Sequence, residues 1–215
     1  MKKVITVMGV DPSLTATSIC IREVGTIKPV KHFNVPFYKK DTDLLGRIKQ
    51  IKTISAIFFE NLKRYEPKII FVENFSYASR NSLPLQGMVM GGILIMLEEY
   101  MRRDGIVSMF PSPQSVKKLI SKGGAKKDLL LKEVYKRFKL DLYDDNMADS
   151  FLLSEMARIE FLLRKEFGNL KEKLIVDRKR VEKFFLSIKK DYGILKSDVE
   201  AVLKVEKIDK LIKVK

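Results

Sequence analysis

Hydrophobic residues along this chain follow two different spacings, which predict strands and helices. Short apolar runs rich in β-branched residues and bounded by Gly, Pro or Asp are typical of buried strands. The predicted strands are residues 3–10, 17–24, 30–36, 68–72 and 106–110. Apolar residues spaced three and four apart share one face of a helix. This spacing predicts helices over residues 41–65, 83–103, 114–121, 128–138 and 145–167.

The order of these elements predicts the fold class. Three strands, a helix, a strand, a helix, a strand and then helices are typical of an α/β protein with three layers. We therefore expect one domain over residues 1–168, with a five-stranded mixed sheet flanked by helices. Residues 169–215 have sparser helical stripes, and Ser197 with Glu200 forms a capping-box pattern. This part is predicted to be a basic helical C-terminal extension.

The predicted helix over residues 83–103 stands apart because residues 88–97 are apolar on every side. A helix that covers one side of a sheet needs only one apolar stripe, so a second covered face is implied. Gly91 and Gly92 cost about 1 kcal/mol each relative to Ala in a helix, and they permit a close backbone approach. A homodimer interface and burial beneath the basic C-terminal extension both account for this pattern.

Charge indicates what the chain binds. It has 42 Lys and Arg residues against 27 Asp and Glu residues, a formal net charge of +15 and a pI near 9.7. Such an excess favours a polyanionic partner, usually nucleic acid, although solvated lysine-rich faces also account for it. The longest apolar run, residues 87–97, is far shorter than the roughly 20 residues that span a bilayer. The single cysteine suits a reducing compartment, and with no signal-peptide pattern we expect a cytoplasmic protein without membrane contact.

Four acidic residues stand at places that favour chemistry. Asp11 follows the first predicted strand and Glu73 the fourth, while Asp145 and Asp149 lie four apart at the start of a predicted helix and share one face. Carboxylates converging at one edge of a sheet would repel one another unless cations lay between them. Hard oxygen ligands suit Mg²⁺ or Mn²⁺. Two such ions about 4 Å apart can activate a water and stabilise the leaving oxygen of a phosphodiester.

Each of these acids also has an ordinary structural interpretation. Asp before Pro opens many turns, and Asp144 or Asp145 at a helix start is a common N-cap. The joint pattern of all four acids on a strongly basic chain favours the metal site.

Four segments resemble, in order and spacing, the motifs of the RuvC-type Holliday junction resolvases, which have an RNase H-like fold. The segments are residues 9–15 (GVDPSLT), residues 71–75 (FVENF) followed by Gly87 and Gly91-Gly92, residues 122–127 (KGGAKK) and residues 145–150 (DNMADS). The last has the form common among phage members. The resemblance covers about residues 3–165, so the C-terminal extension lies outside it.

The resemblance implies a metal-dependent endonuclease that cuts paired strands of four-way and other branched DNA junctions as a symmetric homodimer. By motif position, Asp11, Glu73 and Asp149 are the expected metal ligands, for two Mg²⁺ or Mn²⁺ ions per active site. The family usually places a fourth acid where this chain has Asn146. We assign that role to the neighbouring Asp145, which reaches the same helix face.

The resemblance also implies residues that contact DNA. Lys126 and Lys127 both match a family lysine that stabilises the charge developing on the phosphate, and spacing favours Lys127 as the catalytic one. The family places an aromatic residue three positions after the Glu, where this chain has Ser76 between two aromatic residues. The expected DNA-binding residues are Phe75, Tyr77, Arg80, Lys117, Lys118, Lys122 and Lys126.

Other functions suit the same sequence. One is an architectural junction-binding protein without catalysis, and another is an RNase H-like nuclease acting on flaps or RNA–DNA hybrids. Actin-like sugar kinases also begin with a strand and an Asp, but they need Gly-rich phosphate loops and two such domains, for which this chain is too short. His32, the one histidine, is expected to be a surface residue without a role, and Cys20 to be packed rather than reactive.

Overall fold

A mixed β-sheet forms the centre of the molecule. The computed structural model describes residues 4–36, 43–74, 83–104, 107–120, 127–168 and 178–205. The strands within these residues are β1 (Thr6–Asp11), β2 (Ser18–Glu23), β3 (Lys31–Asn34), β4 (Ile69–Val72) and β5 (Val107–Met109). Their order across the sheet is β3-β2-β1-β4-β5; β2 runs antiparallel to β1 and β3, and β4 runs parallel to β1 and β5. The predicted five-stranded mixed sheet is confirmed.

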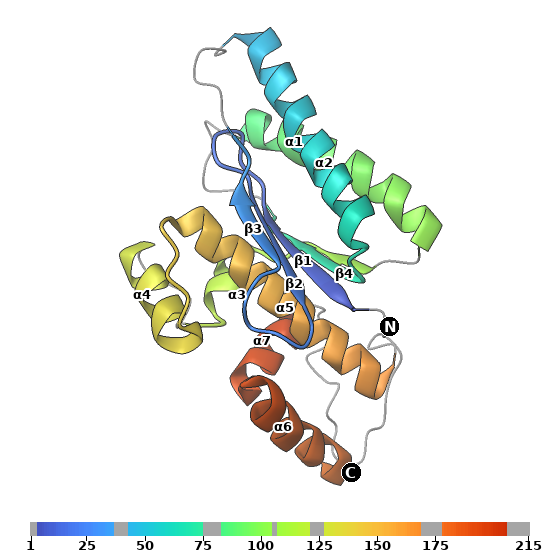
Figure 1. The fold of residues 1–215 in the computed structure, drawn as a ribbon, viewed down its shortest axis with the longest axis vertical. Helices are drawn as coiled ribbons and strands as arrows, with labels where there is room; N and C mark the ends of the chain where they lie inside the picture. Colours follow the sequence, from blue (N-terminus) through green and yellow to red (C-terminus); the bar gives the residue numbers. More distant parts are fainter. Residues whose placement is uncertain are drawn as a thin grey trace.

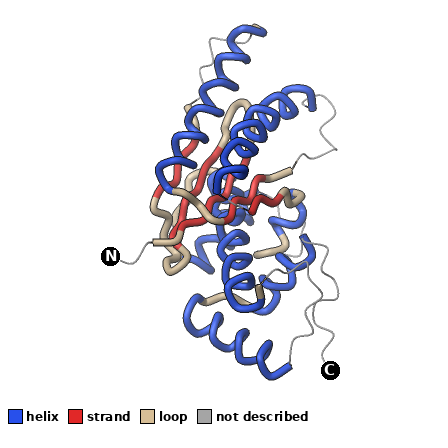
Figure 2. Tube along the Cα trace, turned by 90° about the vertical axis from the view of Figure 1, so that its right-hand side faces the viewer, coloured by secondary structure: helices blue, strands red, loops and turns tan. Residues whose placement is uncertain are grey.

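Helices cover both faces of this sheet. They are α1 (Leu44–Tyr65), α2 (Leu83–Asp104), α3 (Pro113–Lys117), α4 (Lys127–Phe138), α5 (Asp145–Phe167), α6 (Arg178–Tyr192) and α7 (Lys196–Val205). In Figure 1, α1 and α2 lie on one side of the sheet and α5 lies against the other side. Figure 2, turned by 90°, shows the strands between these two groups of helices. The three-layer α/β prediction is therefore confirmed. No helix in the described part of the chain is long and apolar enough to cross a membrane.

The element boundaries differ from the sequence-based ranges by a few residues, for local reasons. The first helix begins at Leu44 because the Asp43 side chain caps it, accepting a hydrogen bond from the Gly46 N–H at 2.7 Å. α3 ends at Lys117, earlier than predicted. β1 is one residue longer than predicted at its end and includes Asp11, so this candidate ligand is part of the strand rather than the loop.

Two apolar cores, one on each face of the sheet, hold the layers together. Met8 and Val10 of β1 face the core formed with α1 and α2, whereas Val7 and Phe71 face the core formed with α5 and the remaining helices. α5 is buried along almost its whole length because the sheet covers one side and other helices cover the rest. Each fully buried large apolar side chain contributes about 1.5–3 kcal/mol, so α5 is firmly fixed against the sheet.

The C-terminal extension, as far as residues 178–205 describe it, packs on the α5 side of the sheet. The extension residues that join the core around α5 are Phe184, Ile188, Val199 and Val202. α2 lies in the core on the opposite face (Figure 1). The described part of the extension therefore does not cover the apolar α2, because the two lie on different faces of the sheet. Met88, Leu94 and Ile95 of α2 are exposed.

The last helix starts with a different cap from the one expected. α7 begins at Lys196, and the Asp198 side chain reaches back to accept a hydrogen bond from the Leu195 N–H at 2.7 Å. This contact is the reciprocal half of a capping box. It replaces the predicted Ser197–Glu200 pair, because the helix starts before Ser197.

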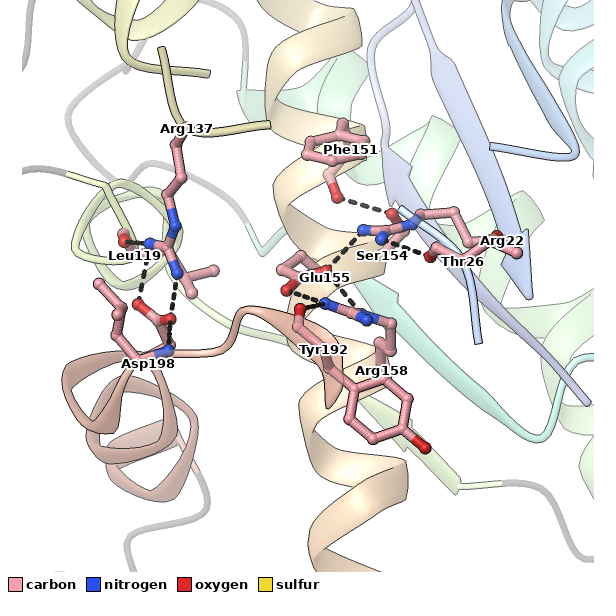
Figure 3. Close-up of polar contacts among 11 residues, drawn as sticks. Arg22, Thr26, Leu119, Arg137, Phe151, Ser154, Glu155, Arg158, Tyr192 and Asp198 are labelled. Carbon is pink, nitrogen blue, oxygen red and sulfur yellow. Dashed lines mark hydrogen bonds and ion pairs between the residues drawn. The ribbon is translucent and has the colours of Figure 1, made fainter. Parts of the chain in front are cut away.

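A buried charge network ties α6 to α5 and β2 (Figure 3). The Arg22 Nη1 donates to Glu155 Oε2 at 2.6 Å, and Arg158 donates to the same carboxylate from Nε at 2.9 Å and from Nη2 at 2.7 Å. Arg158 Nη2 also donates to the carbonyl of Tyr192, at the end of α6, at 3.3 Å. Burial opposes ionisation of Glu155, but the two guanidinium groups hold its pKa below the usual value. The network anchors the extension to the centre of the molecule.

Candidate active site

Two carboxylates lie side by side at the sheet edge where β1 and β4 end. Asp11 is the last residue of β1, and Glu73 directly follows β4. The two strands are parallel, with Val10 opposite Val72, and the Glu73 N–H donates to the Val10 carbonyl at 2.9 Å. Because parallel strands bring their carboxyl ends to one edge, the side chains of Asp11 and Glu73 meet and share a hydrogen bond.

Helix α5 brings a third carboxylate to this edge. Gly9 of β1 lies so close to the α5 backbone at Ser150 that an added Cβ would overlap the Ser150 carbonyl oxygen. The contact sets Asp149, the residue before Ser150, beside Asp11, two residues further along β1. Asp11 and Asp149 are only 8% and 9% exposed. Three carboxylates from three separate elements therefore converge in a largely dry place.

The first turn of α5 separates a structural aspartate from a candidate ligand. Asp144 is the N-cap, accepting from the Met147 N–H at 2.7 Å, and it also accepts from Asn34 Nδ2 at 2.5 Å. Asp145 is the first helical residue and is half-buried, and its charge acts on Asp11. Ordinary capping therefore explains Asp144, and the role of Asp145 as the fourth acid stays a prediction.

Burial and repulsion raise the pKa of both Asp11 and Glu73. Loss of hydration is the largest cause for each carboxyl. Repulsion by Asp149 follows for Asp11, and repulsion by Asp11 and then Asp149 follows for Glu73. The hydrogen bond that Glu73 donates lowers the pKa of Asp11 and raises that of Glu73, so the two carboxyls titrate as a pair. Clustered acids with shifted pKa values are typical of functional sites.

Lys117 of α3 lies close enough to these acids to act on both. Its positive charge lowers the pKa of Asp11 and of Glu73, against the effect of burial. The reason is topological. β5 runs parallel to β4, and α3 follows β5, so α3 begins at the sheet edge where the acids lie. Lys117 was predicted as a DNA-binding residue, and its closeness to the carboxylates was not predicted. Its position could have indicated this closeness, because α3 follows a parallel strand and ligand sites of α/β proteins lie at the carboxyl ends of such strands.

The oxygen atoms of this cluster fit a hard divalent cation. Glu73 Oε1 is buried and has no hydrogen-bond partner among the described residues, and leaving a buried acceptor unpaired costs about 1–3 kcal/mol. In the described ranges, no three His, Cys, Asp or Glu side chains are already grouped as the ligands of one ion. A divalent cation between ionised carboxylates removes their mutual repulsion. Asp11, Glu73 and Asp149 thus offer suitable oxygen ligands, although their side chains are not yet arranged around one ion.

The arrangement of strands and helices has counterparts among solved structures. RuvC of Thermus thermophilus matches with a TM-score of 0.56 and 18% identity, over 75% of this chain and 96% of its own. In complex with a Holliday junction substrate, it matches with a TM-score of 0.58 and 20% identity over the same shares. This chain has the fold of RuvC.

A weaker overlap extends to a eukaryotic protein. The yeast mitochondrial Holliday junction resolvase Ydc2 has a TM-score of 0.47 and 15% identity, over 76% of this chain and 83% of its own. A scan against protein-family models and a search of curated protein sequences find no match. The likeness to RuvC is therefore one of fold, found through the structure.

The other predicted residues of this RuvC fold are only partly described. Lys127 is the first residue of α4, but its side chain lies outside the described part. Lys118 follows α3 as its C-cap and is exposed. The predicted DNA-binding residues outside the described ranges are Phe75, Tyr77, Arg80, Lys122 and Lys126. The roles of all of these residues stay predictions.

Two residues of β2 and β3, Cys20 and His32, contact serines of α5. His32 is not the surface residue expected: it is half-buried on β3, and its Nε2 lies 3.0 Å from Ser150 Oγ. Burial lowers the pKa of His32 to about 4, so the ring is neutral near pH 7. Cys20 is fully buried, and burial raises the pKa of its thiol to about 12. The prediction that Cys20 is packed is confirmed.

Proposed function

We propose that this chain is a metal-dependent endonuclease that resolves four-way and other branched DNA junctions by paired phosphodiester hydrolysis. The observation that carries the proposal is the convergence of the buried Asp11 and Asp149 with the half-buried Glu73, beside Lys117. A negative cluster of this kind in a chain with a net charge of +15 suits cations and a polyanionic substrate together. The likeness to a RuvC structure solved with a Holliday junction substrate supports branched DNA as that substrate.

The proposed metal ligands are Asp11, Glu73 and Asp149, with Asp145 as the fourth acid. Two Mg²⁺ or Mn²⁺ ions held by these oxygens would supply the activation of a water and the stabilisation of the leaving oxygen. Backbone contacts within the chain hold the carboxylates in position. The Gly9 contact with α5 holds Asp149 against β1, and the Glu73 N–H bond holds the two strand ends together.

Lysines supply the positive charge that the reacting phosphate needs. Lys117 already lies close to the carboxylates, where an ammonium group can stabilise charge that develops in the transition state. Lys127 is proposed for the same task from the next helix. The proposed contacts along the DNA strands, made to phosphates and unstacked bases, come from Phe75, Tyr77, Arg80, Lys118, Lys122 and Lys126.

The proposed enzyme works as a homodimer built on α2. Met88, Leu94 and Ile95 form an exposed apolar stretch on this helix. A hollow of about 560 Å³ lies beside them, between α2 and β5, lined by Leu94, Leu97, Met101 and Phe110 among others. Paired cuts in a symmetric junction require two equivalent active sites, which a two-fold dimer supplies. Ile95→Asp is expected to convert a dimer to a monomer in sedimentation equilibrium, with Leu45→Asp on α1, also an exposed apolar residue, as the charge-matched control.

The deciding experiment is a cleavage assay on end-labelled four-way junctions. Linear duplex, Y-fork and RNA–DNA hybrid serve as comparison substrates, each with Mg²⁺, Mn²⁺ or EDTA. We expect paired symmetric nicks at the junction, only with a divalent metal. Junction binding without cutting in either metal would overturn the proposal in favour of an architectural protein. Preferred cutting of the hybrid or fork would reassign the substrate and keep the nuclease.

A further inference from the structure

We propose that Asp198, in the C-terminal extension, is a positioning residue for cleavage: acting through Arg137, it holds α3 and therefore Lys117 at the carboxylates. This inference rests on the proposed endonuclease function. It assigns the extension, which lies outside the sequence resemblance, a task in the reaction itself.

The contact joins the consecutive helices α3 and α4 to α7, which lies far along the chain (Figure 3). Arg137, near the end of α4, donates from Nη1 to the Leu119 carbonyl at 2.7 Å and to Asp198 Oδ1 at 2.9 Å. Its Nη2 pairs with Asp198 Oδ2. In Figure 3 the guanidinium group of Arg137 lies between Leu119 and Asp198. The last turn after α3 is thus linked to α7 by one side chain.

Burial makes this link strong and specific. The Asp198 side chain is 0% exposed and that of Arg137 is 20% exposed. Asp198 Oδ2 also accepts from the Leu195 N–H at 2.7 Å, so both carboxylate oxygens are engaged. A two-armed arginine–carboxylate contact in a place with little water fixes orientation as well as distance. Removing one partner leaves the other charge buried and unpaired.

α3 needs outside support because it is very short. It has five residues, whereas isolated helices below about 12 residues are marginal in water. Val116 and Leu119 hold it by packing into the core around α5. The Leu119 carbonyl belongs to the last turn, where carbonyls lack partners within the helix, and Arg137 supplies the missing donor. Lys117 lies between these two anchors, so a loosened Leu119 end frees Lys117 to move away from the acids.

The extension has a second attachment that does not reach α3. The network of Arg22, Glu155 and Arg158 ends on the carbonyl of Tyr192. Val202 of α7 packs into the core around α5 with 0% exposure. Changes at these contacts loosen the extension without touching Arg137. They separate the specific effect of Asp198 from a general loss of stability.

The test uses the full chain with Asp198→Asn and, as the matched control on the same helix, Val202→Ala. Asn keeps an oxygen for the Leu195 N–H but loses the charge that pairs with Arg137. We expect Asp198→Asn to slow single-turnover junction cleavage about tenfold and to leave junction affinity in Ca²⁺ within about twofold. Amide exchange at Lys118 and Leu119 should accelerate. Val202→Ala should lower the unfolding temperature, with cleavage and α3 exchange unchanged.

A second variant, Arg137→Lys, keeps the test decisive if Asp198→Asn folds poorly. Arg137→Lys retains the charge but cannot reach Leu119 and Asp198 in two-armed fashion, and it should slow cleavage in the same way. Combined with Asp198→Asn, it should cost no more than either change alone, because both break one contact.

Three results would overturn the inference. These are unchanged cleavage and α3 exchange in Asp198→Asn, equal losses in Asp198→Asn and Val202→Ala, or additive losses in the double variant. If the wild-type chain cuts no substrate, the proposed function fails and the catalytic role of Asp198 fails with it. The exchange measurement would then still decide whether Asp198 holds α3.

Discussion

Gly9 and Ser150 touch backbone to backbone, which makes a strand and a helix meet without a side chain between them. The contact brings the start of α5 down onto the centre of the sheet. Asp149 therefore lies beside Asp11. A residue with any side chain at position 9 would push α5 outward and separate the carboxylates.

Gly9→Ala is expected to destabilise the protein by about 3 kcal/mol, because the added methyl group meets backbone atoms that cannot turn away. Urea unfolding measures this. Gly25→Ala is the control, since nothing lies within 4 Å of a Cβ at Gly25, and it should change stability by less than about 0.5 kcal/mol. Equal effects in both variants would contradict the close contact.

Asp11→Asn is expected to reduce junction cleavage by about 10³-fold or more while junction binding is kept, because the change removes a proposed metal ligand and no proposed DNA contact. In EDTA the variant should also be more stable by about 1 kcal/mol, since one of several repelling carboxylates is gone. Single-turnover cleavage and thermal unfolding check the two effects. Glu60→Gln, an exposed acid on α1, is the control, and retained cleavage in Asp11→Asn would remove this residue from the site.

Lys117→Ala is expected to slow cleavage about 10²-fold and to weaken junction binding much less, because its charge acts at the carboxylates and the reacting phosphate. The neighbouring Lys118 is exposed, so Lys118→Ala should mainly weaken binding. Comparing the two variants under single-turnover conditions separates the roles. Similar losses of rate and affinity in both would make Lys117 an ordinary phosphate contact.

His32 should make the protein less stable as the pH falls. Its pKa is about 4 in the folded protein and about 6.5 in the unfolded chain. Between these values the unfolded chain binds the extra proton, so the stabilising contribution is complete above about pH 6.5 and is lost as the pH falls toward 4. Between pH 7.5 and 5 the loss is about 1–2 kcal/mol. His32→Asn should flatten this part of the profile in urea unfolding, and an unchanged slope would assign it to other groups.

The exposed face of α6 should contribute charge to DNA binding. Its exposed lysines include Lys183, Lys189 and Lys190. Changing these three to Gln should weaken junction binding. The slope of the logarithm of the binding constant against the logarithm of the salt concentration should become shallower by up to about 2–3, because fewer counterions are released. The cleavage rate at saturating protein should be unchanged. The control changes the exposed lysines Lys49, Lys52 and Lys63 of α1 to Gln, and an equal effect there would mean that only net charge matters.

Local patterns predicted the main elements of the fold because each strand or helix is decided largely by residues close in the sequence. The alternation of apolar runs with Gly, Pro and Asp was enough to predict β1 and β4 to within a few residues. The structure shows that these two strands run parallel, so the acids at their ends meet at one edge of the sheet. The sequence predicted Asp11 and Glu73 together because each directly follows an apolar predicted strand.

Tertiary structure decided what depends on contacts between distant segments. Lys117 reaches the acids only because β5 lies beside β4, and His32 is half-buried only because α5 crosses the sheet at Gly9. Asp198 and Arg137, 61 residues apart, have no shared periodicity that could mark them as partners. The sequence also did not predict which face of the sheet the C-terminal extension covers. An apolar stripe indicates that one side of a helix is buried, but it does not indicate which element buries it. The tendency to form a helix or a strand depends on a few neighbouring residues. Which charges are buried, and which side chains meet at a site, depends on the packing of the whole chain.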